Sequence, residues 1–192
     1  MDTGGKRIIL ASNSPRRREL MAALGLDFTV DTGTSFIETY SPDTPHVEVP
    51  GLMSCGKSHG FHRPLAEDEI LVTSDTMVLC GNEILGKPAD KGDAERMLKL
   101  LSGREHQVIT AVTIRDSKRE KTFSVTSNVF FKSLSDSEID YYIEKYKPFD
   151  KAGAYGIQEW IGYIGITGIE GSFYNVMGFP TQRFYEELQE FL

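Results

Sequence analysis

The stretch ILASNSPRRREL, residues 9–20, predicts a β-strand that runs directly into an α-helix. Its apolar residues give way to a polar loop, and Ser14 followed by Pro15 is a typical N-cap with proline at the first helical position. Three consecutive arginines then fill the first helical turn. A helix N-terminus is electropositive, so each such cation costs roughly 0.3–1 kcal/mol unless an anion lies nearby. The stretch therefore indicates an α/β unit whose helix start holds an anion.

The three arginines differ in the direction they take from this helix. On a helical wheel, Arg16 and Arg17 flank the apolar stripe that contains Leu20, whereas Arg18 lies on the far side. We therefore expect Arg16 and Arg17 to reach a ligand and Arg18 to meet solvent. The stretch alone equally allows three solvated arginines offset by Glu19.

The bulk composition is that of one globular domain, residues 1–192, with 40% hydrophobic residues. The sequence has no apolar run of about eighteen residues and no leader with a cleavage site, so we expect a cytoplasmic protein that binds no membrane. Its 21 basic and 28 acidic residues give a net charge of −7, which argues against binding a nucleic acid polymer.

Cysteine and histidine residues do not indicate a zinc site. Cys55 and Cys80 lack the spacing of metal ligands, and Cys80 lies in an apolar run where a buried thiol is expected. His59, His62 and His106 show no pairing at i, i+4. We therefore expect no catalytic zinc centre.

The rest of the chain alternates between strand and helix patterns. Antiparallel hairpins are indicated twice, so the predicted fold is α/β or an α+β mixture with hairpins in its sheet. The expected elements are a strand at 28–30, a surface loop at 31–45, a weak helix at 46–61 interrupted by proline and glycines, a hairpin at 69–88 turning at 81–82, a helix at 90–103, a hairpin at 106–134 turning at 116–118, a helix at 136–145 opened by a capping box, a glycine-rich tail from 150, and a helix at 181–191.

The first hairpin places three polar residues at a strand end. If residues 81–82 form a two-residue turn, the register extends to a pairing of Thr76 with Lys87, next to Asp75. A carboxylate suits Mg²⁺ and an ammonium suits a phosphate oxygen. An ordinary exposed strand end with a weak ion pair remains the alternative.

Five sequence blocks occur in a characteristic order: LASNSPRRREL, SDT followed by LGKP, LSGREHQVITAV, YKPFDKAGAYGIQ and GSFYNVMGFP. In this order they resemble the Maf family of nucleotide pyrophosphatases over nearly the whole chain. The resemblance implies a Maf/ITPase-like α/β fold, with an elongated mixed β-sheet flanked by helices and a central substrate cleft. It also implies a metal-dependent hydrolysis of a nucleoside triphosphate to the monophosphate and pyrophosphate.

The resemblance assigns site residues as well. Ser58 departs from it, since the family usually has alanine after the helix lysine. The assigned residues are Ser12, Ser14, Arg16 and Arg17 in the triphosphate cradle, Glu38 as a loop acid, Lys57 as the helix lysine, Asp75 as the strand carboxylate, and Lys87 as the hairpin lysine.

The chemistry implied needs an aligned water, neutralised phosphates and a stabilised leaving group. Glu38 and Asp75 would hold a divalent cation, Mg²⁺ or else Mn²⁺ or Co²⁺, and Asp75 would orient or deprotonate the water. Lys57, Lys87 and Arg16 would stabilise developing charge. Either Asp75 or Glu38 is left open as the base.

Thr76 and Gln158 resemble the mark of the family branch that acts on dTTP and UTP, or on modified pyrimidine nucleotides. A glutamine amide offers a donor and an acceptor together, matching a pyrimidine carbonyl and imide N–H. A non-catalytic nucleotide-binding regulator of cell division or septum formation is the alternative, and a homodimer is left open. A P-loop enzyme is disfavoured because no G-x-x-x-x-G-K-[ST] occurs.

Overall fold

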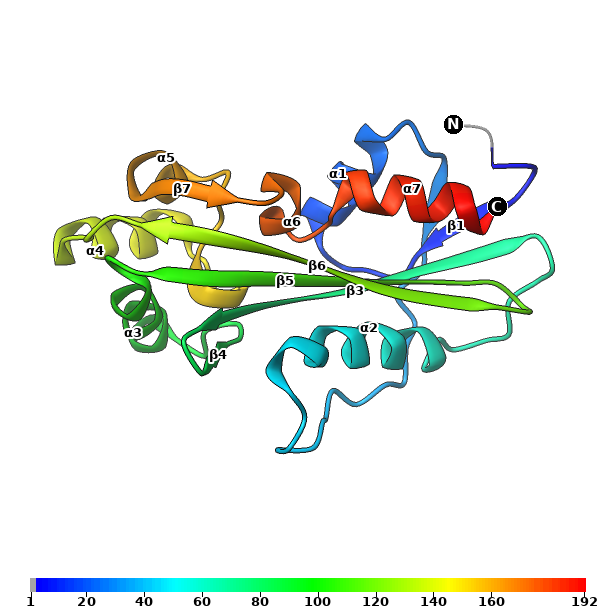
Figure 1. Ribbon diagram of the computed structural model, residues 1–192, viewed down its shortest axis with the longest axis horizontal. Coiled ribbons are helices and arrows are strands. Elements are labelled where there is room, and N and C mark those ends of the chain that lie inside the picture. The colour runs from blue at the N-terminus through cyan, green and yellow to red at the C-terminus, as the bar shows by residue number, and fades with distance from the viewer. Residues whose placement is uncertain (1–2) are drawn as a thin grey trace. The chain divides into compact units, whose positions relative to one another are not determined.

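A computed structural model describes residues 3–192 (Figure 1). The seven-stranded sheet has the strand order β2-β1-β3-β5-β6-β7, with β4 beside β3, and contains both parallel and antiparallel pairs. The predicted α/β class, with a mixed sheet flanked by helices, is confirmed. The elements are β1 (Arg7–Leu10), α1 (Pro15–Ala23), β2 (Phe28–Val30), η1 (His46–Glu48), α2 (Val49–His59), β3 (Glu69–Cys80), β4 (Glu83–Leu85), α3 (Lys91–Leu101), β5 (Glu105–Arg115), β6 (Glu120–Phe131), α4 (Asp136–Tyr146), η2 (Ala152–Ala154), α5 (Trp160–Gly165), β7 (Ile166–Glu170), α6 (Phe173–Met177) and α7 (Thr181–Phe191).

The chain divides into two compact units. The first contains the N-terminal residues to Asp75, together with 110–125 and 178–192, and the second contains 76–109 and 126–177. Strands β3, β5 and β6 contribute residues to both units. The expectation of a single domain over 1–192, and of a central substrate cleft, stays a prediction. Within the part of the chain that the structure describes, no helix combines the length and the apolar character needed to cross a membrane.

In the first unit, β1 pairs in parallel with β2 on one side and with β3 on the other, and Ile9 lies beside Leu71 in the core. Helices α1 and α7 lie on one face of these strands and α2 on the other (Figure 1). A buried polar contact fixes α2: the Ser54 hydroxyl lies 3.2 Å from the Thr73 carbonyl oxygen and 2.9 Å from the Thr113 hydroxyl. Helix α2 is thereby held in register on the sheet.

Helix α2 is continuous over eleven residues, so the prediction of an interrupted helix was wrong. Pro50 stands in the first turn, where its missing N–H has no helical partner anyway. Gly56 serves packing, because a Cβ built there would lie 2.3 Å from the Phe36 ring. Tertiary contact therefore explains a glycine that looked like a helix breaker.

In the second unit, the hairpin of β3 and β4 turns at the predicted residues. The ladder ends at Leu85, however, so the predicted pairing of Thr76 with Lys87 was wrong. The next carbonyl, that of Gly86, accepts instead from the Gly153 N–H at 3.0 Å. The chain leaves the sheet two residues earlier than the extrapolated register required.

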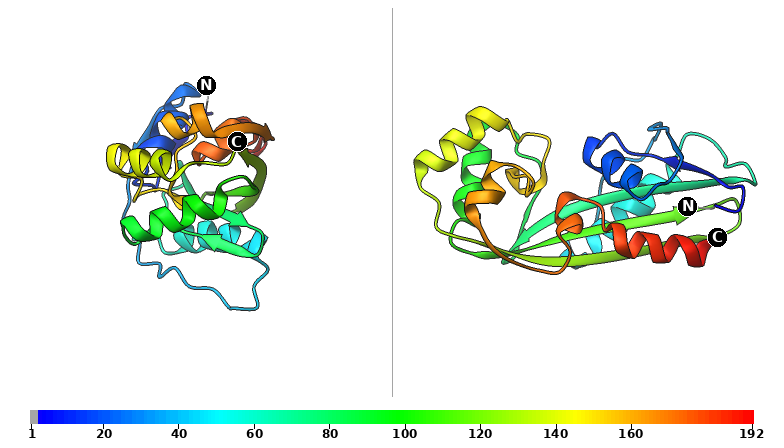
Figure 2. Two further views of the ribbon diagram at one scale, coloured as in Figure 1. Left: turned by 90° about the vertical axis from the view of Figure 1, so that its left-hand side faces the viewer. Right: turned by 90° about the horizontal axis from the view of Figure 1, so that it is seen from above.

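Helices α3 and α4 of the second unit follow the sequence closely. Helix α4 begins with the predicted capping box of Ser135 and Glu138, and it packs on α3 (Figure 2). The glycine-rich segment, where the sequence indicated only a tail, contains α5, β7 and α6. Helix α3 buries the four apolar residues expected, Ala94, Met97, Leu98 and Leu101.

Candidate functional site

A lysine and two carboxylates from three segments meet in the first unit. Lys57 of α2 places its Nζ 2.6 Å from Oδ1 of Asp75, at the end of the first unit's part of β3, and 2.8 Å from Oε1 of Glu38 in the loop 31–45. The Lys57 and Asp75 side chains are only 21% and 19% exposed, whereas that of Glu38 is 60% exposed. The three residues assigned to helix, strand and loop are thus brought together.

Contacts at the end of α2 position the loop acid. The Ser35 N–H donates to the Gly60 carbonyl at 2.8 Å, and Thr34 forms a bridge with Phe61. Phe36 then lies over Gly56, where a Cβ would not fit. Glu38 follows two residues later, so the packed aromatic ring anchors the part of the loop that leads to its carboxylate. Sequence reasoning missed this role of Phe36, and the glycine one residue before Lys57 was its only local signal.

The loop before α1 folds around its own polar groups. The Ser14 hydroxyl accepts from the Arg17 N–H at 3.4 Å, and the Ser14 N–H donates to Oγ of Ser12 at 3.2 Å. The Arg17 guanidinium donates to the carbonyls of Ser74 at 2.8 Å and Gly178 at 3.0 Å. Arg17 therefore ties the loop to the strand that carries the acid, in addition to supplying charge.

The charges of this region act on one another. Burial lowers the pKa of Arg17 to about 10, Asp75 and Glu38 act to raise it, and Arg16 acts to lower it further. Arg17 nevertheless remains a cation at neutral pH, since its pKa lies above 7. Arg16, Arg17 and the two carboxylates therefore form one electrostatic group in the first unit.

Arg18 does not extend into solvent, so that prediction was wrong. It is half-buried, and its Nε and Nη2 each lie 3.3 Å from the Ser12 carbonyl oxygen. A helical wheel gives the direction of a Cβ, but the long side chain folds back over the preceding turn.

The remaining assigned residues belong to the second unit. Lys87 is exposed, and no described residue pairs with its ammonium. Thr76 and Gln158 are half-buried. The Gln158 Oε1 atom is buried and lacks a hydrogen-bond donor among the residues that the structure describes. A buried acceptor without a donor is uncommon in proteins and calls for a ligand or a water.

A buried ion network supports the segment that carries this glutamine. The Lys151 ammonium lies 3.1 Å from Oε1 of Glu159, and the other oxygen of that carboxylate accepts from the Tyr142 hydroxyl. The hydroxyl oxygen in turn accepts from the Gly156 N–H at 3.0 Å. Burial, reinforced by the carboxylate, raises the pKa of Tyr142. The network fixes both sides of Gln158 along the chain.

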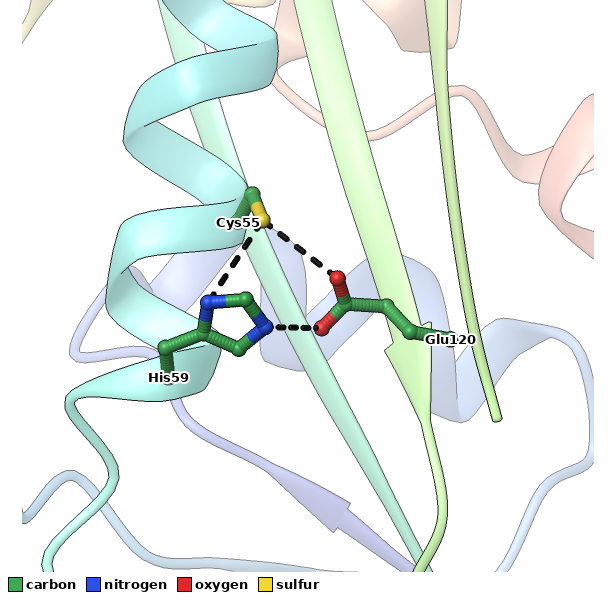
Figure 3. Close-up of side chains that lie close together, drawn as sticks. All are labelled: Cys55, His59 and Glu120. Carbon is green, nitrogen blue, oxygen red and sulfur yellow. Dashed lines mark hydrogen bonds and ion pairs between the residues drawn. The ribbon is translucent and has the colours of Figure 1, made fainter. Parts of the chain in front are cut away.

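A second cluster of potential ligands lies in the first unit. Cys55 and His59 project from α2 toward Glu120 at the start of β6 (Figure 3). Burial raises the pKa of the Cys55 thiol, and its hydrogen bond to Glu120 adds to this rise. The two cysteines lack metal-ligand spacing with respect to each other, but the i, i+4 pair Cys55–His59, visible in the sequence, was overlooked. The carboxylate, 65 residues further along the chain, could be found only in the fold.

Comparison with known proteins gives consistent matches over the chain. The family model described as "Maf-like protein" matches residues 7–191. A "dTTP/UTP pyrophosphatase" of Phocaeicola vulgatus is 48% identical over 184 residues, covering 96% of this chain and 95% of that protein. A protein of the same name from Parabacteroides distasonis is 49% identical over 185 residues, covering 96% of each chain. Among solved structures, a HAM1 protein from Coxiella burnetii aligns over 66% of this chain and 73% of that chain, with a TM-score of 0.41 and 14% identity, too weak a likeness to carry an argument.

Proposed function

The chain belongs to the Maf family, and we propose that it is a nucleoside triphosphate pyrophosphatase that acts on dTTP and UTP. Relatives of 48% and 49% identity bear the name dTTP/UTP pyrophosphatase. The observation that carries the proposal is the Lys57 ammonium held between the carboxylates of Asp75 and Glu38. A cation for phosphate oxygens and a base for water lie side by side there.

The proposed reaction breaks the anhydride bond between the α and β phosphates. The water oxygen forms a bond to phosphorus as the bond to the bridging oxygen breaks, and pyrophosphate leaves with the electron pair. Asp75 takes the proton of the water, since its contact with Lys57 uses Oδ1 and leaves Oδ2 available. Lys57 stabilises the charge that develops on the phosphates.

Carboxylate oxygens are the ligands that Mg²⁺ prefers, and Mn²⁺ also accepts them. The donor set of Glu38 and Asp75 therefore fits the divalent cation that the family resemblance implies. When bound there, this cation neutralises phosphate charge.

The remaining first-unit residues form the triphosphate cradle of the proposal. Ser12, Ser14 and the first turn of α1 supply hydroxyl and N–H donors, as helix N-termini do in other phosphate sites. Arg16 and Arg17 supply positive charge. Lys87, whose exposed ammonium belongs to the second unit, keeps the role of a phosphate contact that the resemblance implies.

For base selection, the unsatisfied acceptor of Gln158 is the supporting observation. Thymine and uracil carry an N3–H donor, whereas N3 of cytosine is an acceptor. A donor facing Oε1 satisfies the buried atom, whereas cytosine presented with N3 at the same place leaves it unpaired. The Thr76 hydroxyl can donate or accept as either base requires. The thymine methyl group is worth only about 1–3 kcal/mol, so dTTP and UTP should be used similarly.

The test is incubation of the purified protein and Mg²⁺ with dTTP, UTP, CTP, ATP and GTP, with products separated by anion-exchange chromatography. Monophosphate and pyrophosphate from dTTP and UTP are expected. Release of orthophosphate and a diphosphate would contradict the bond assignment. Tight nucleotide binding without turnover would instead favour the non-catalytic regulator. The expectations of a cytoplasmic location and of a possible homodimer, made from the sequence, stay predictions.

A further inference from the structure

We propose that Cys55, His59 and Glu120 form a binding site for one divalent cation of the zinc class, separate from the carboxylates of the pyrophosphatase site. The three side chains come from α2 and β6 of the first unit, and their ligand atoms all lie within 4.8 Å of one another (Figure 3). Nothing in the proposed hydrolysis uses them.

The spacing of the ligand atoms suits a tetrahedral ion. Residues at i, i+4 leave the same face of a helix, which brings Cys55 Sγ to 3.9 Å from Nδ1 of His59. Sγ lies 3.4 Å from Oε1 of Glu120. In a tetrahedral site with Zn–S of about 2.3 Å and Zn–N of about 2.1 Å, the sulfur and nitrogen are about 3.6 Å apart. In the structure Glu120 contacts the other ring nitrogen, with Nε2 of His59 3.0 Å from Oε2, so binding requires the His59 and Glu120 side chains to turn until one nitrogen, one oxygen and Sγ face the same ion.

The donor types select the metal. Thiolate and imidazole favour zinc and similar borderline ions, whereas Mg²⁺ requires oxygen ligands. Three protein ligands leave a fourth position for water. On binding, the Cys55 thiol forms a sulfur–metal bond and releases its proton to solvent. We therefore expect this site not to bind Mg²⁺, the cation proposed for the nucleotide site.

Neighbouring groups hold the ligands and provide an entry path. The buried Ser58 hydroxyl lies 3.4 Å from Oε2 of Glu120 and accepts from Nε of Arg115 at 2.8 Å. Such outer contacts orient metal ligands. An open hollow of about 270 Å³ is lined by His59 and Glu120 among others. The Arg115 cation, 3.8 Å from Oε2, opposes the metal's charge and limits its affinity.

Cobalt provides a direct test, because a thiolate–Co²⁺ bond gives a charge-transfer absorbance in the near ultraviolet. The full chain is freed of metal with a chelator and titrated with Co²⁺ and then with Zn²⁺. We expect the absorbance to saturate at one Co²⁺ per chain and to disappear as Zn²⁺ displaces it. Zn²⁺ should raise the melting temperature, and Mg²⁺ should not produce or displace the absorbance.

Matched variants assign the ligands. Cys55→Ser should abolish the band, and His59→Gln and Glu120→Gln should weaken binding by about 100-fold or more, since even outer-shell changes cost about 10–100-fold. Cys80→Ala, at the other cysteine, and His46→Gln, just before α2, should leave the band intact. Absence of the band in the wild type, or its loss in Cys80→Ala, overturns the proposal. No nucleotide is used, so the result is independent of pyrophosphatase activity.

Discussion

Lys57 and Lys151 each contact two carboxylates, yet their surroundings differ. Lys57 lies between Asp75 and Glu38 at 2.6 and 2.8 Å, and Lys151 lies between Asp150 and Glu159 at 2.8 and 3.1 Å. The Lys151 side chain is 9% exposed and the Lys57 side chain 21%.

The Lys151 network closes on itself, because the Glu159 carboxylate also accepts from the Tyr142 hydroxyl, which accepts from a backbone N–H. The Lys57 group recruits a loop carboxylate that is 60% exposed. Each lysine thus has one exposed carboxylate partner, Asp150 at 55% and Glu38 at 60%, and the difference lies in the other partner. Both oxygens of Glu159 are occupied, by Lys151 and by Tyr142, whereas Asp75 contacts Lys57 through Oδ1 alone, which leaves Oδ2 for the proposed chemistry.

Asp75→Asn should produce the largest change in activity. The amide keeps the size of the side chain but cannot take a proton, so pyrophosphate release should fall by about 10²–10⁴-fold. Initial rates on dTTP and UTP measure this loss, while melting temperature and nucleotide titration check that fold and binding persist. Near-normal release would transfer the role of base to Glu38.

Replacing each lysine by methionine tests the comparison itself. Lys151→Met leaves Glu159, whose side chain is 19% exposed and hydrogen-bonded to the buried Tyr142, without its cation and should lower the free energy of unfolding by about 3 kcal/mol. Lys57→Met should lower it by less, because the Lys57 side chain is 21% exposed against 9% for Lys151, while losing most activity. Urea unfolding and initial rates on both variants provide the measurement. Equal destabilisation would remove the distinction between the two lysines.

Gln158→Ala tests the segment next to Glu159, which the Lys151 ion pair holds in place. Loss of the buried acceptor should reduce the preference for UTP over CTP by about 10–100-fold, as expected for a removed buried hydrogen bond of about 1–3 kcal/mol. Competition between the two nucleotides in one reaction gives the ratio directly. If the rates with UTP and CTP fell together and their ratio did not change, the Gln158 side chain would not be selecting the base.

Gly56→Ala should give the smallest effect, acting on Glu38 through Phe36. The new methyl group would clash with the Phe36 ring and displace it. We therefore expect a loss of about 1–2 kcal/mol in the free energy of unfolding and, because the loop that carries Glu38 shifts with the ring, about tenfold in activity. Gly51→Ala is the control in the same helix, since its Cβ meets only the Ser124 hydroxyl at 3.9 Å. That variant should gain up to about 1 kcal/mol and keep its activity. Similar activities in the two variants would contradict the positioning role.

Short sequence motifs predicted the helices and strands well, but they did not predict which distant segments these elements contact. The Ser14 cap, the hairpin turn and the capping box each depend on residues within one turn, and all are present. Gly56 was misread because the ring that needs it lies twenty positions earlier in the chain. The pairing of Thr76 with Lys87 failed because a register was extended past the end of β4.

The candidate site shows the same division. Lys57, Asp75 and Glu38 were assigned by resemblance, and nothing in their own sequence spacing brings them together. The cysteine–histidine pair on α2 was readable at i, i+4, yet Glu120 required the packing of β6. Sequence periodicity describes an element, whereas a site also depends on which elements become neighbours.

The two hydrogen bonds that the Arg17 guanidinium donates to backbone carbonyls have a consequence for synthesis on the ribosome. Their acceptors, the carbonyls of Ser74 and Gly178, belong to segments separated by the whole second unit. At about 5–20 residues per second, the intervening residues take roughly 5–20 s to be made. During this interval the nascent N-terminal part contains the strand residues up to Asp75 but not α7. The first unit can therefore complete its packing only after the last helix has been synthesised.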